Sequence, residues 1–201
     1  TEALAIAQTL HDTLTIYNRQ TNKTTRLNIK RPTRALFHNN LLYVLSNSPA
    51  SLHTFSASLE PLSQTPVSSG PADLLIQKST LYIAASSTNF LDILDIANPA
   101  QPKPRERINL APIASWPVGM TPATLSLDKD TNRLYIACSD ANSIAVLDLN
   151  TRRLLGYLPT AWYPTYALPT SNNSVLVLNG KGERSFPNPN GPNPTIHPTM
   201  T

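Results

Sequence analysis

The sequence predicts an all-β fold, namely a β-propeller with about four four-stranded blades. Three observations support this prediction: a strand-like word that recurs along the chain, a proline that precedes most copies of it at a nearly constant distance, and a composition suited to short strands and turns. The 201 residues include 19 prolines but only 6 glycines, and 14% of them are charged. Helical bundles and coiled coils need more Ala, Glu, Lys and Leu at helical spacing, so this composition disfavours them.

Two markers repeat in the same frame. The word Leu-Tyr-(Ile/Val) starts at Leu42, Leu81 and Leu134, and weaker forms start at Leu4 and Val175. Every word except the first follows a proline by ten to twelve residues, and the four prolines, 39, 51 and 42 residues apart, are Pro32, Pro71, Pro122 and Pro164. A period of about forty residues is typical of a propeller blade with four short strands.

The unit that begins at Pro122 contains all four expected strands, at residues 123–127, 133–138, 144–149 and 153–158. Asp, Asn and Thr occupy the turns between them, and Asn and Asp tolerate the left-handed backbone conformation that glycine usually supplies. This explains how a turn-rich chain manages with few glycines. The longer interval between Pro71 and Pro122 predicts an insertion near residues 98–104, where the sequence is rich in proline.

The repeat divides the chain into a single incomplete propeller domain, residues 1–201. A partial blade (1–31) precedes three whole blades (32–70, 71–121 and 122–163), and a partial blade (164–201) carries a proline-rich loop at 183–201. This division gives 17 strands, starting at the second strand of one blade. We expect a slice of a larger, seven-bladed ring. The alternative is a four-bladed ring in which 166–168 pairs with 4–7, but it leaves 175–178 without a role.

The unit from Pro122 to Pro164 resembles the YVTN-type β-propeller repeat, through residues 119–122, 134–138 and 144–148. Residues 160–165, 177–182 and 187–192 resemble bacterial proteins that fuse such a propeller to an alkaline-phosphatase-like phosphoesterase domain. The resemblance extends over about residues 121–194, with Ala161 in place of the usual glycine and Cys138 in place of asparagine. It implies a periplasmic or secreted bacterial protein whose phosphoesterase residues lie beyond the propeller. No signal peptide is visible in the sequence.

The sequence predicts no catalytic residue, metal site or cofactor in this chain. The four histidines and Cys138 show no spacing typical of zinc ligands, so we expect Cys138 to pack as a small apolar residue. The Gly180–Gly182 segment lacks the first glycine and the Ser/Thr of a phosphate-binding loop, so it is interpreted as a turn. Asp95 and Asp148 end equivalent third strands, which indicates a turn-capping role.

One binding surface is predicted from strand order. In a meander of antiparallel strands, the link before the first strand and the loop after the second strand lie at the same end of the strands, and therefore on the same face of the ring. Trp162 and Tyr163 should therefore neighbour Lys181 and Arg184, and aromatic and cationic side chains suit a docking surface. The possible partners are an adjacent catalytic domain or another protein. The competing interpretation is that the proline-rich loop simply covers Trp162, or that it packs on a part of the protein outside these residues.

Three functions follow for comparison. The first is a non-catalytic binding and scaffold module attached to a phosphoesterase domain. The second is a lactonase-like propeller hydrolase acting on a sugar lactone, which we disfavour because residues 123–127 and 166–168 offer no acid or histidine to a channel. The third, nucleic-acid binding through the basic stretch 19–34, is disfavoured because no aromatic residues are regularly interleaved with its cations. No apolar stretch is long enough to predict a membrane span.

Overall fold

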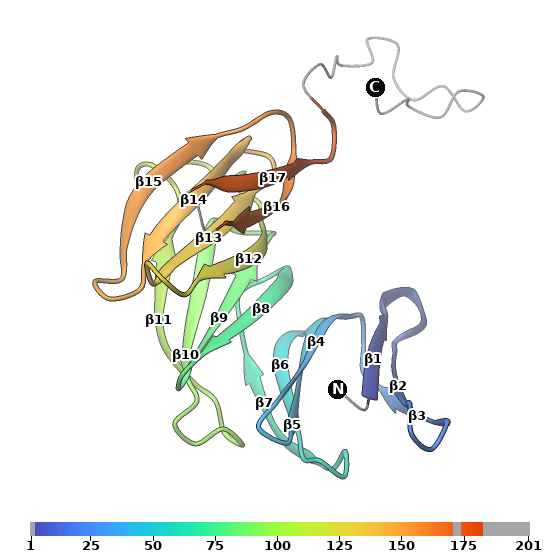
Figure 1. Ribbon diagram of the computed structural model, residues 1–201. Helices are drawn as coiled ribbons and strands as arrows, with labels where there is room; N and C mark the ends of the chain where they lie inside the picture. Colours follow the sequence, from blue (N-terminus) through green and yellow to red (C-terminus); the bar gives the residue numbers. More distant parts are fainter. Residues whose placement is uncertain (1–2, 171–173, 183–201) are drawn as a thin grey trace, which may run out of the picture. The chain divides into compact units, whose positions relative to one another are not determined.

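The computed structural model describes residues 3–170 and 174–182. Its regular structure in these residues consists of 17 strands and one short 3-10 turn, Thr9–His11 (Figure 1). The all-β prediction is confirmed, and so is the predicted number of strands. Among the described residues, no helix has the length and apolar character that crossing a bilayer requires.

The strands form five antiparallel sheets whose strands follow chain order. Three of the sheets have four strands, and each of these begins at one of the predicted prolines. The first sheet has three strands, β1 (Ala3–Gln8), β2 (Thr13–Asn18) and β3 (Lys23–Asn28). The second comprises β4 (Pro32–His38), β5 (Leu41–Asn47), β6 (Ala50–Phe55) and β7 (Pro61–Pro66).

The remaining sheets continue the same pattern. The third comprises β8 (Pro71–Gln77), β9 (Thr80–Ala85), β10 (Phe90–Asp95) and β11 (Lys103–Asn109). The fourth comprises β12 (Pro122–Asp128), β13 (Arg133–Cys138), β14 (Ser143–Asp148) and β15 (Arg153–Pro159), and the fifth has β16 (Pro164–Pro169) and β17 (Val175–Asn179). The predicted proline-rich loop at 183–201 lies outside the described residues.

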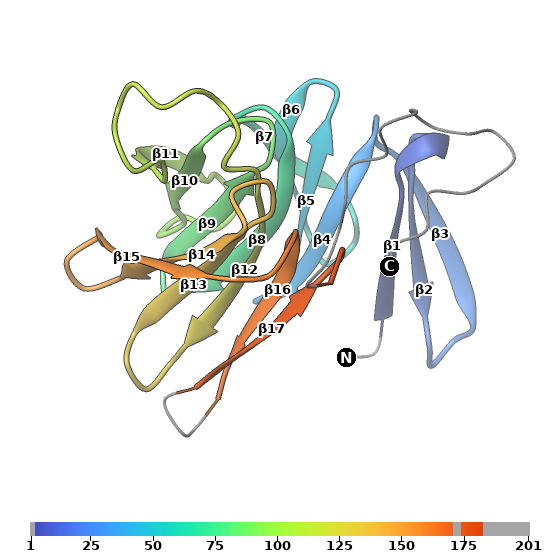
Figure 2. The ribbon, with the colours of Figure 1, turned by 90° about the horizontal axis from the view of Figure 1, so that it is seen from above.

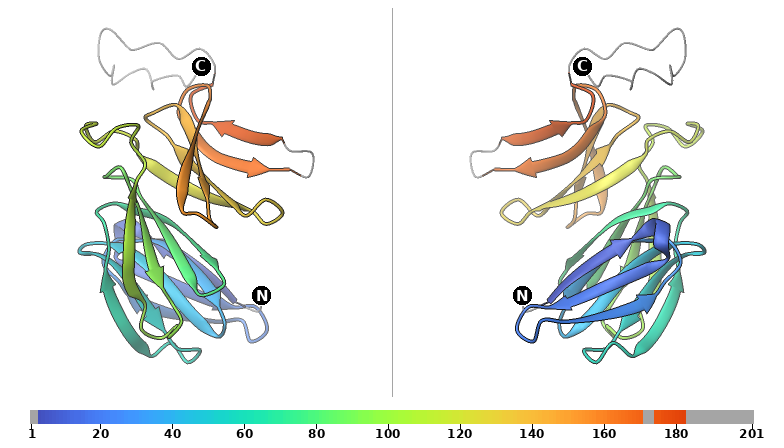
Figure 3. Two further views of the ribbon diagram at one scale, coloured as in Figure 1. Left: turned by 90° about the vertical axis from the view of Figure 1, so that its left-hand side faces the viewer. Right: turned by 90° about the vertical axis from the view of Figure 1, so that its right-hand side faces the viewer.

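The chain forms two compact units, Thr1–Val118 and Gly119–Thr201. The first unit holds the first three sheets, and in it β4 lies beside both β1 and β8 (Figure 2). The second unit holds the fourth and fifth sheets, and β16 lies against β12 and β13. The strands of the four-stranded sheets are visibly twisted (Figure 3), as expected for L-amino acids.

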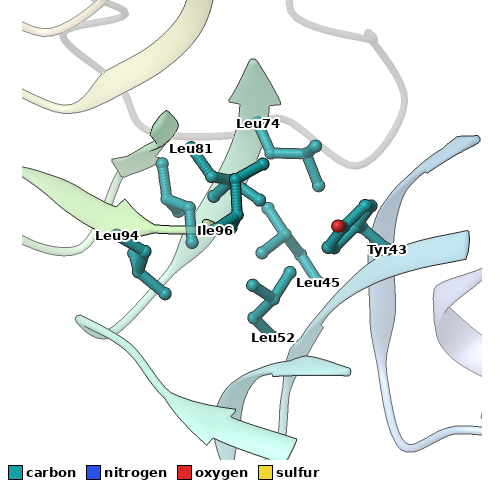
Figure 4. Close-up of a cluster of buried hydrophobic side chains, with 8 residues drawn as sticks. Tyr43, Leu45, Leu52, Leu74, Leu81, Leu94 and Ile96 are labelled. Atoms are coloured by element: carbon teal, nitrogen blue, oxygen red, sulfur yellow. The ribbon is translucent and has the colours of Figure 1, made fainter. Parts of the chain in front are cut away.

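In the first unit, apolar side chains are buried on both faces of the second sheet. Successive side chains of a strand point to opposite faces, and β5 buries both sets. Tyr43 and Leu45 pack toward the third sheet, whereas Leu42 and Val44 pack toward the first sheet. The cluster between the second and third sheets (Figure 4) consists of Tyr43, Leu45, Leu52, Leu74, Leu81, Ile83, Leu94 and Ile96. Two-sided burial explains the nearly continuous apolar runs in the sequence.

The core of the second unit lies between the fourth and fifth sheets. Tyr135 and Ala137 of β13 are buried there, with Ala167 of β16 opposite. Val175 and Val177 of β17 also pack against this cluster, and Val177 is the cross-strand partner of Ala167. The fifth sheet therefore contributes one face of its two strands to a shared apolar layer.

Most of the residues that make the third blade longer than its neighbours lie outside the predicted insertion at 98–104. β11 already begins at Lys103, so the loop after β10 spans only 96–102. The link that follows β11 runs over 110–121, whereas the equivalent links are short, at 67–70 and 160–163. The predicted insertion at 98–104 is therefore wrong in its position. The prolines of this stretch belong partly to the loop at 96–102 and partly to the outer strand β11, so they do not mark an insertion.

The loop at 96–102 nevertheless has a packing role. The Tyr43 hydroxyl donates a hydrogen bond to the Pro99 carbonyl at 3.0 Å, and the Thr65 hydroxyl donates to the Pro102 carbonyl at 3.0 Å. Both donors belong to the second sheet. The loop thus satisfies buried hydroxyl groups of the neighbouring sheet, which would otherwise be costly to bury.

Candidate functional site

The link before β16 and the segment after β17 meet in the second unit. The Trp162 N–H donates to the Gly182 carbonyl at 3.0 Å, and the Lys181 N–H donates to the Trp162 carbonyl at 3.2 Å. The Gly180 N–H donates to the Tyr163 carbonyl at 2.8 Å. These bonds bring together three of the four residues predicted as a binding surface. We call Trp162, Tyr163 and Lys181 the turn cluster.

The side chains of the turn cluster combine aromatic surface with positive charge. The Lys181 Nζ lies 4.6 Å from the centroid of the Tyr163 ring, which is a cation–π distance. Trp162 is 47% exposed. The indole of Trp162 is therefore about half exposed, and the neighbouring Tyr163 ring carries the cation. Arg184 lies outside the described residues, so its predicted place in this surface stays a prediction.

The backbone of the turn cluster is held in an uncommon conformation. Tyr163 has a φ of 60°, in the left-handed region that bulky residues seldom adopt. Its N–H donates to the Asn142 Oδ1 at 2.8 Å, and the Ser139 hydroxyl donates to the Pro164 carbonyl at 2.8 Å. The turn between β13 and β14 thus fixes the position of the aromatic pair.

The acids singled out in the sequence cap turns. The Asp148 Oδ1 accepts the N–H groups of Asn150 and Thr151, both at 2.8 Å. These bonds, that from Thr151 first, lower the pKa of Asp148, since they favour its charged form. The Asp95 Oδ1 accepts the Ala97 N–H at 2.7 Å. Each carboxylate therefore accepts hydrogen bonds from backbone N–H groups of the turn that follows it.

Cys138 is buried in β13. Burial raises the pKa of its thiol to about 12. The protonated thiol is a poor nucleophile and a poor metal ligand. Within residues 3–170 and 174–182, no three His, Cys, Asp or Glu side chains gather closely enough to hold a metal ion.

Sequence reasoning missed an ion pair on the first strands of two neighbouring blades. The Arg34 Nε of β4 lies 2.9 Å from the Asp73 Oδ1 of β8, and the two side chains are 58% and 8% exposed. Each residue stands two positions after its blade's leading proline. The signal in the sequence is this shared offset, which aligns Arg34 with Asp73, but the same offset in the later blades selects the uncharged Thr124 and Tyr166.

Solved structures share this fold. Hydrazine synthase from Kuenenia stuttgartiensis matches 88% of this chain over 52% of its own length, with a TM-score of 0.73 and 16% identity. A 6-phosphogluconolactonase-like protein from Bacteroides uniformis matches 89% over 61%, with a TM-score of 0.72 and 14% identity. Both are propeller-like proteins. This chain is a β-propeller.

A functionally unknown protein from Desulfotomaculum acetoxidans shares the propeller fold as well, with a TM-score of 0.70 and 15% identity over 89% of this chain and 59% of its own. The propeller chain thus spans between about half and three fifths of the length of these three neighbours. No protein-family profile and no curated protein matches it. Identities this low show the fold alone.

Proposed function

We propose that this propeller is a non-catalytic binding and scaffold module, and that the turn cluster is its docking surface. The observation that supports the proposal is the exposure of Trp162 on a turn that backbone hydrogen bonds hold in place. Tryptophan dominates many protein–protein interfaces because it buries a large area and loses little side-chain entropy. A turn that is already ordered adds little further entropy cost on binding.

We propose a folded phosphoesterase domain as the partner, attached to the propeller in a bacterial periplasmic or secreted protein. The resemblance of residues 160–165 and 177–182 to YVTN–phosphoesterase fusions supports this choice. Lys181 beside Tyr163 supplies the positive charge that an acidic patch on such a domain would complement. Attachment would raise the effective concentration of the partner, so modest intrinsic affinity is sufficient.

The test is calorimetric titration of the propeller with an isolated alkaline-phosphatase-like domain from a YVTN fusion protein. Trp162→Ala should weaken binding at least about tenfold, the range expected for a hot-spot residue. Trp116→Ala is the matched control, because Trp116 is also 47% exposed but belongs to the first unit. Equal weakening by both substitutions, or no binding of the domain by the wild-type chain, would contradict the proposal.

A lactonase-like hydrolase is the second candidate, and a specific observation favours it. The Arg34–Asp73 pair places an acid on a first strand, and one structural neighbour is a 6-phosphogluconolactonase-like protein. The assay is hydrolysis of 6-phosphogluconolactone with and without added divalent cations. Turnover that disappears in Asp73→Asn but persists in Trp162→Ala would establish this candidate. An absence of turnover with every cation would remove it.

A further inference from the structure

A small cavity opens beside the outer strands of the third sheet, in the first unit. Its volume is about 280 Å³. It lies where the register of β10 and β11 shifts between Ile93 and Leu94, so that one residue of β11 is left over. The cavity's charged walls are Asp92, Arg105, Glu106 and Arg107, and its apolar walls include Pro66 and Pro104.

A buried carboxylate anchors the cavity. Asp92 is only 5% exposed, and it accepts two hydrogen bonds from Ser68, at 2.6 Å from the backbone N–H and 2.7 Å from the hydroxyl. Its third partner is the Arg107 Nε, at 2.9 Å. A buried charge needs this degree of satisfaction to be tolerated. The hydrogen bonds from Ser68 hold the Asp92 carboxylate in place, and the carboxylate in turn orients the Arg107 side chain.

Arg107 is held on two sides. Its Nε is bound to Asp92, and its guanidinium carbon lies 5.2 Å from the centroid of the Phe90 ring. The side chain is still 53% exposed. Besides Nε–H, a guanidinium carries four N–H groups on its two terminal nitrogens. Their planar fork is ordered before any ligand arrives, which reduces the entropy lost on binding.

We propose that this cavity binds a small monocarboxylate. The carboxylate would accept parallel hydrogen bonds from the terminal nitrogens of Arg107, the geometry for which the guanidinium is suited. The apolar part of the ligand would lie against Pro66 and Pro104. Asp92 and Glu106 balance the two arginines that line the cavity, so there is no excess positive charge to favour a dianion such as phosphate.

The test uses benzoate, which has a planar carboxylate on an apolar ring. In a nuclear magnetic resonance titration of the whole chain, the Arg107 Nε–H signal should shift and saturate. Arg107→Lys should lower the association constant at least tenfold, because lysine keeps the charge but lacks the fork. Arg34→Lys is the matched control, since Arg34 also binds a buried aspartate through Nε, on other strands, and its affinity should equal that of the wild type.

A second variant covers the case in which Arg107→Lys does not fold. Pro66→Phe narrows the cavity from its apolar wall and leaves the Ser68–Asp92–Arg107 hydrogen bonds in place. It should also lower the association constant for benzoate at least tenfold. The proposal is overturned if benzoate binds this variant as tightly as the wild type, if inorganic phosphate binds as tightly as benzoate, or if the Arg34 signal shifts in parallel with that of Arg107.

Discussion

At the scale of single residues, the positions before the four leading prolines explain how the chain turns with so few glycines. Arg31, Gly70, Thr121 and Tyr163 all have positive φ, at 48°, 72°, 52° and 60°. The carbonyl of each accepts a hydrogen bond from a residue at the end of the blade's second strand or just after it. This bond repeats in each of the four blades that begin with a leading proline, so it offsets the backbone strain there, and only one of the four positions is a glycine.

Gly70 is the exception for a reason of space. A Cβ atom at this position would lie 2.5 Å from the backbone nitrogen of Ser87, which cannot move away as a flexible side chain could. Gly70→Ala should lower the free energy of unfolding by at least about 2 kcal/mol, since left-handed strain adds to the clash. Urea unfolding measures this loss. Thr121→Ala, at the equivalent position of the next blade, should cost clearly less, and equal losses would contradict the argument.

His53 should make stability depend on pH. Its Nε2 lies 2.9 Å from the Ser46 hydroxyl in a partly buried site, and burial lowers the pKa of the imidazole from its usual 6.5. The unfolded chain then binds a proton more readily than the folded one. The contribution of neutral His53 to the free energy of unfolding is fully present above pH 6.5. It decreases as the pH drops from 6.5 toward the lowered pKa of the folded state.

Urea unfolding at a series of pH values measures this contribution of His53. The slope below pH 6.5 should be steeper in the wild type than in His53→Gln, by at most about 1.4 kcal/mol per pH unit for one proton. Comparing the two proteins first at pH 8 separates this effect from any general loss of packing. Identical slopes in the two proteins would show that His53 does not contribute.

At the scale of strands and blades, the sequence predicted the frame well because each marker has a physical cause. The prolines at 32, 71, 122 and 164 mark the starts of first strands, where a missing N–H is tolerated. The Leu-Tyr words mark second strands, which are buried on both faces. Both features are local, so they can be read without knowing the contacts of the folded chain.

The features that the sequence misplaced or missed depend on contacts between distant residues. The long link at 110–121 resembles ordinary loop sequence, and the prolines of β11 drew the predicted insertion away from it. The Arg34–Asp73 pair joins residues of different blades. The turn cluster was predictable as a juxtaposition because strand order alone brings its two segments to one edge. Whether it binds a partner stays a prediction.

At the scale of the whole chain, strands of the first and last sheets expose apolar side chains. In β17, Val175 and Val177 pack into the core, whereas Leu176 and Leu178 are 58% and 56% exposed. In β1, alanines pack inward and Leu4 and Ile6 are 50% and 49% exposed. Second strands of the interior blades bury both faces, so these side chains follow the apolar pattern of a strand that packs between two sheets.

Such exposed apolar faces and strand edges should cause the 201-residue chain to self-associate. Light scattering should show an average mass that rises between micromolar and submillimolar concentrations. The double substitution Leu176→Thr, Leu178→Thr places a β-branched strand former at both positions and removes the apolar surface, so it should reduce the association. Leu62→Thr is the matched control, because Leu62 is 41% exposed on an outer strand that is not part of this face. A wild-type chain that stays monomeric over the whole range would show that these leucines are tolerated in solvent.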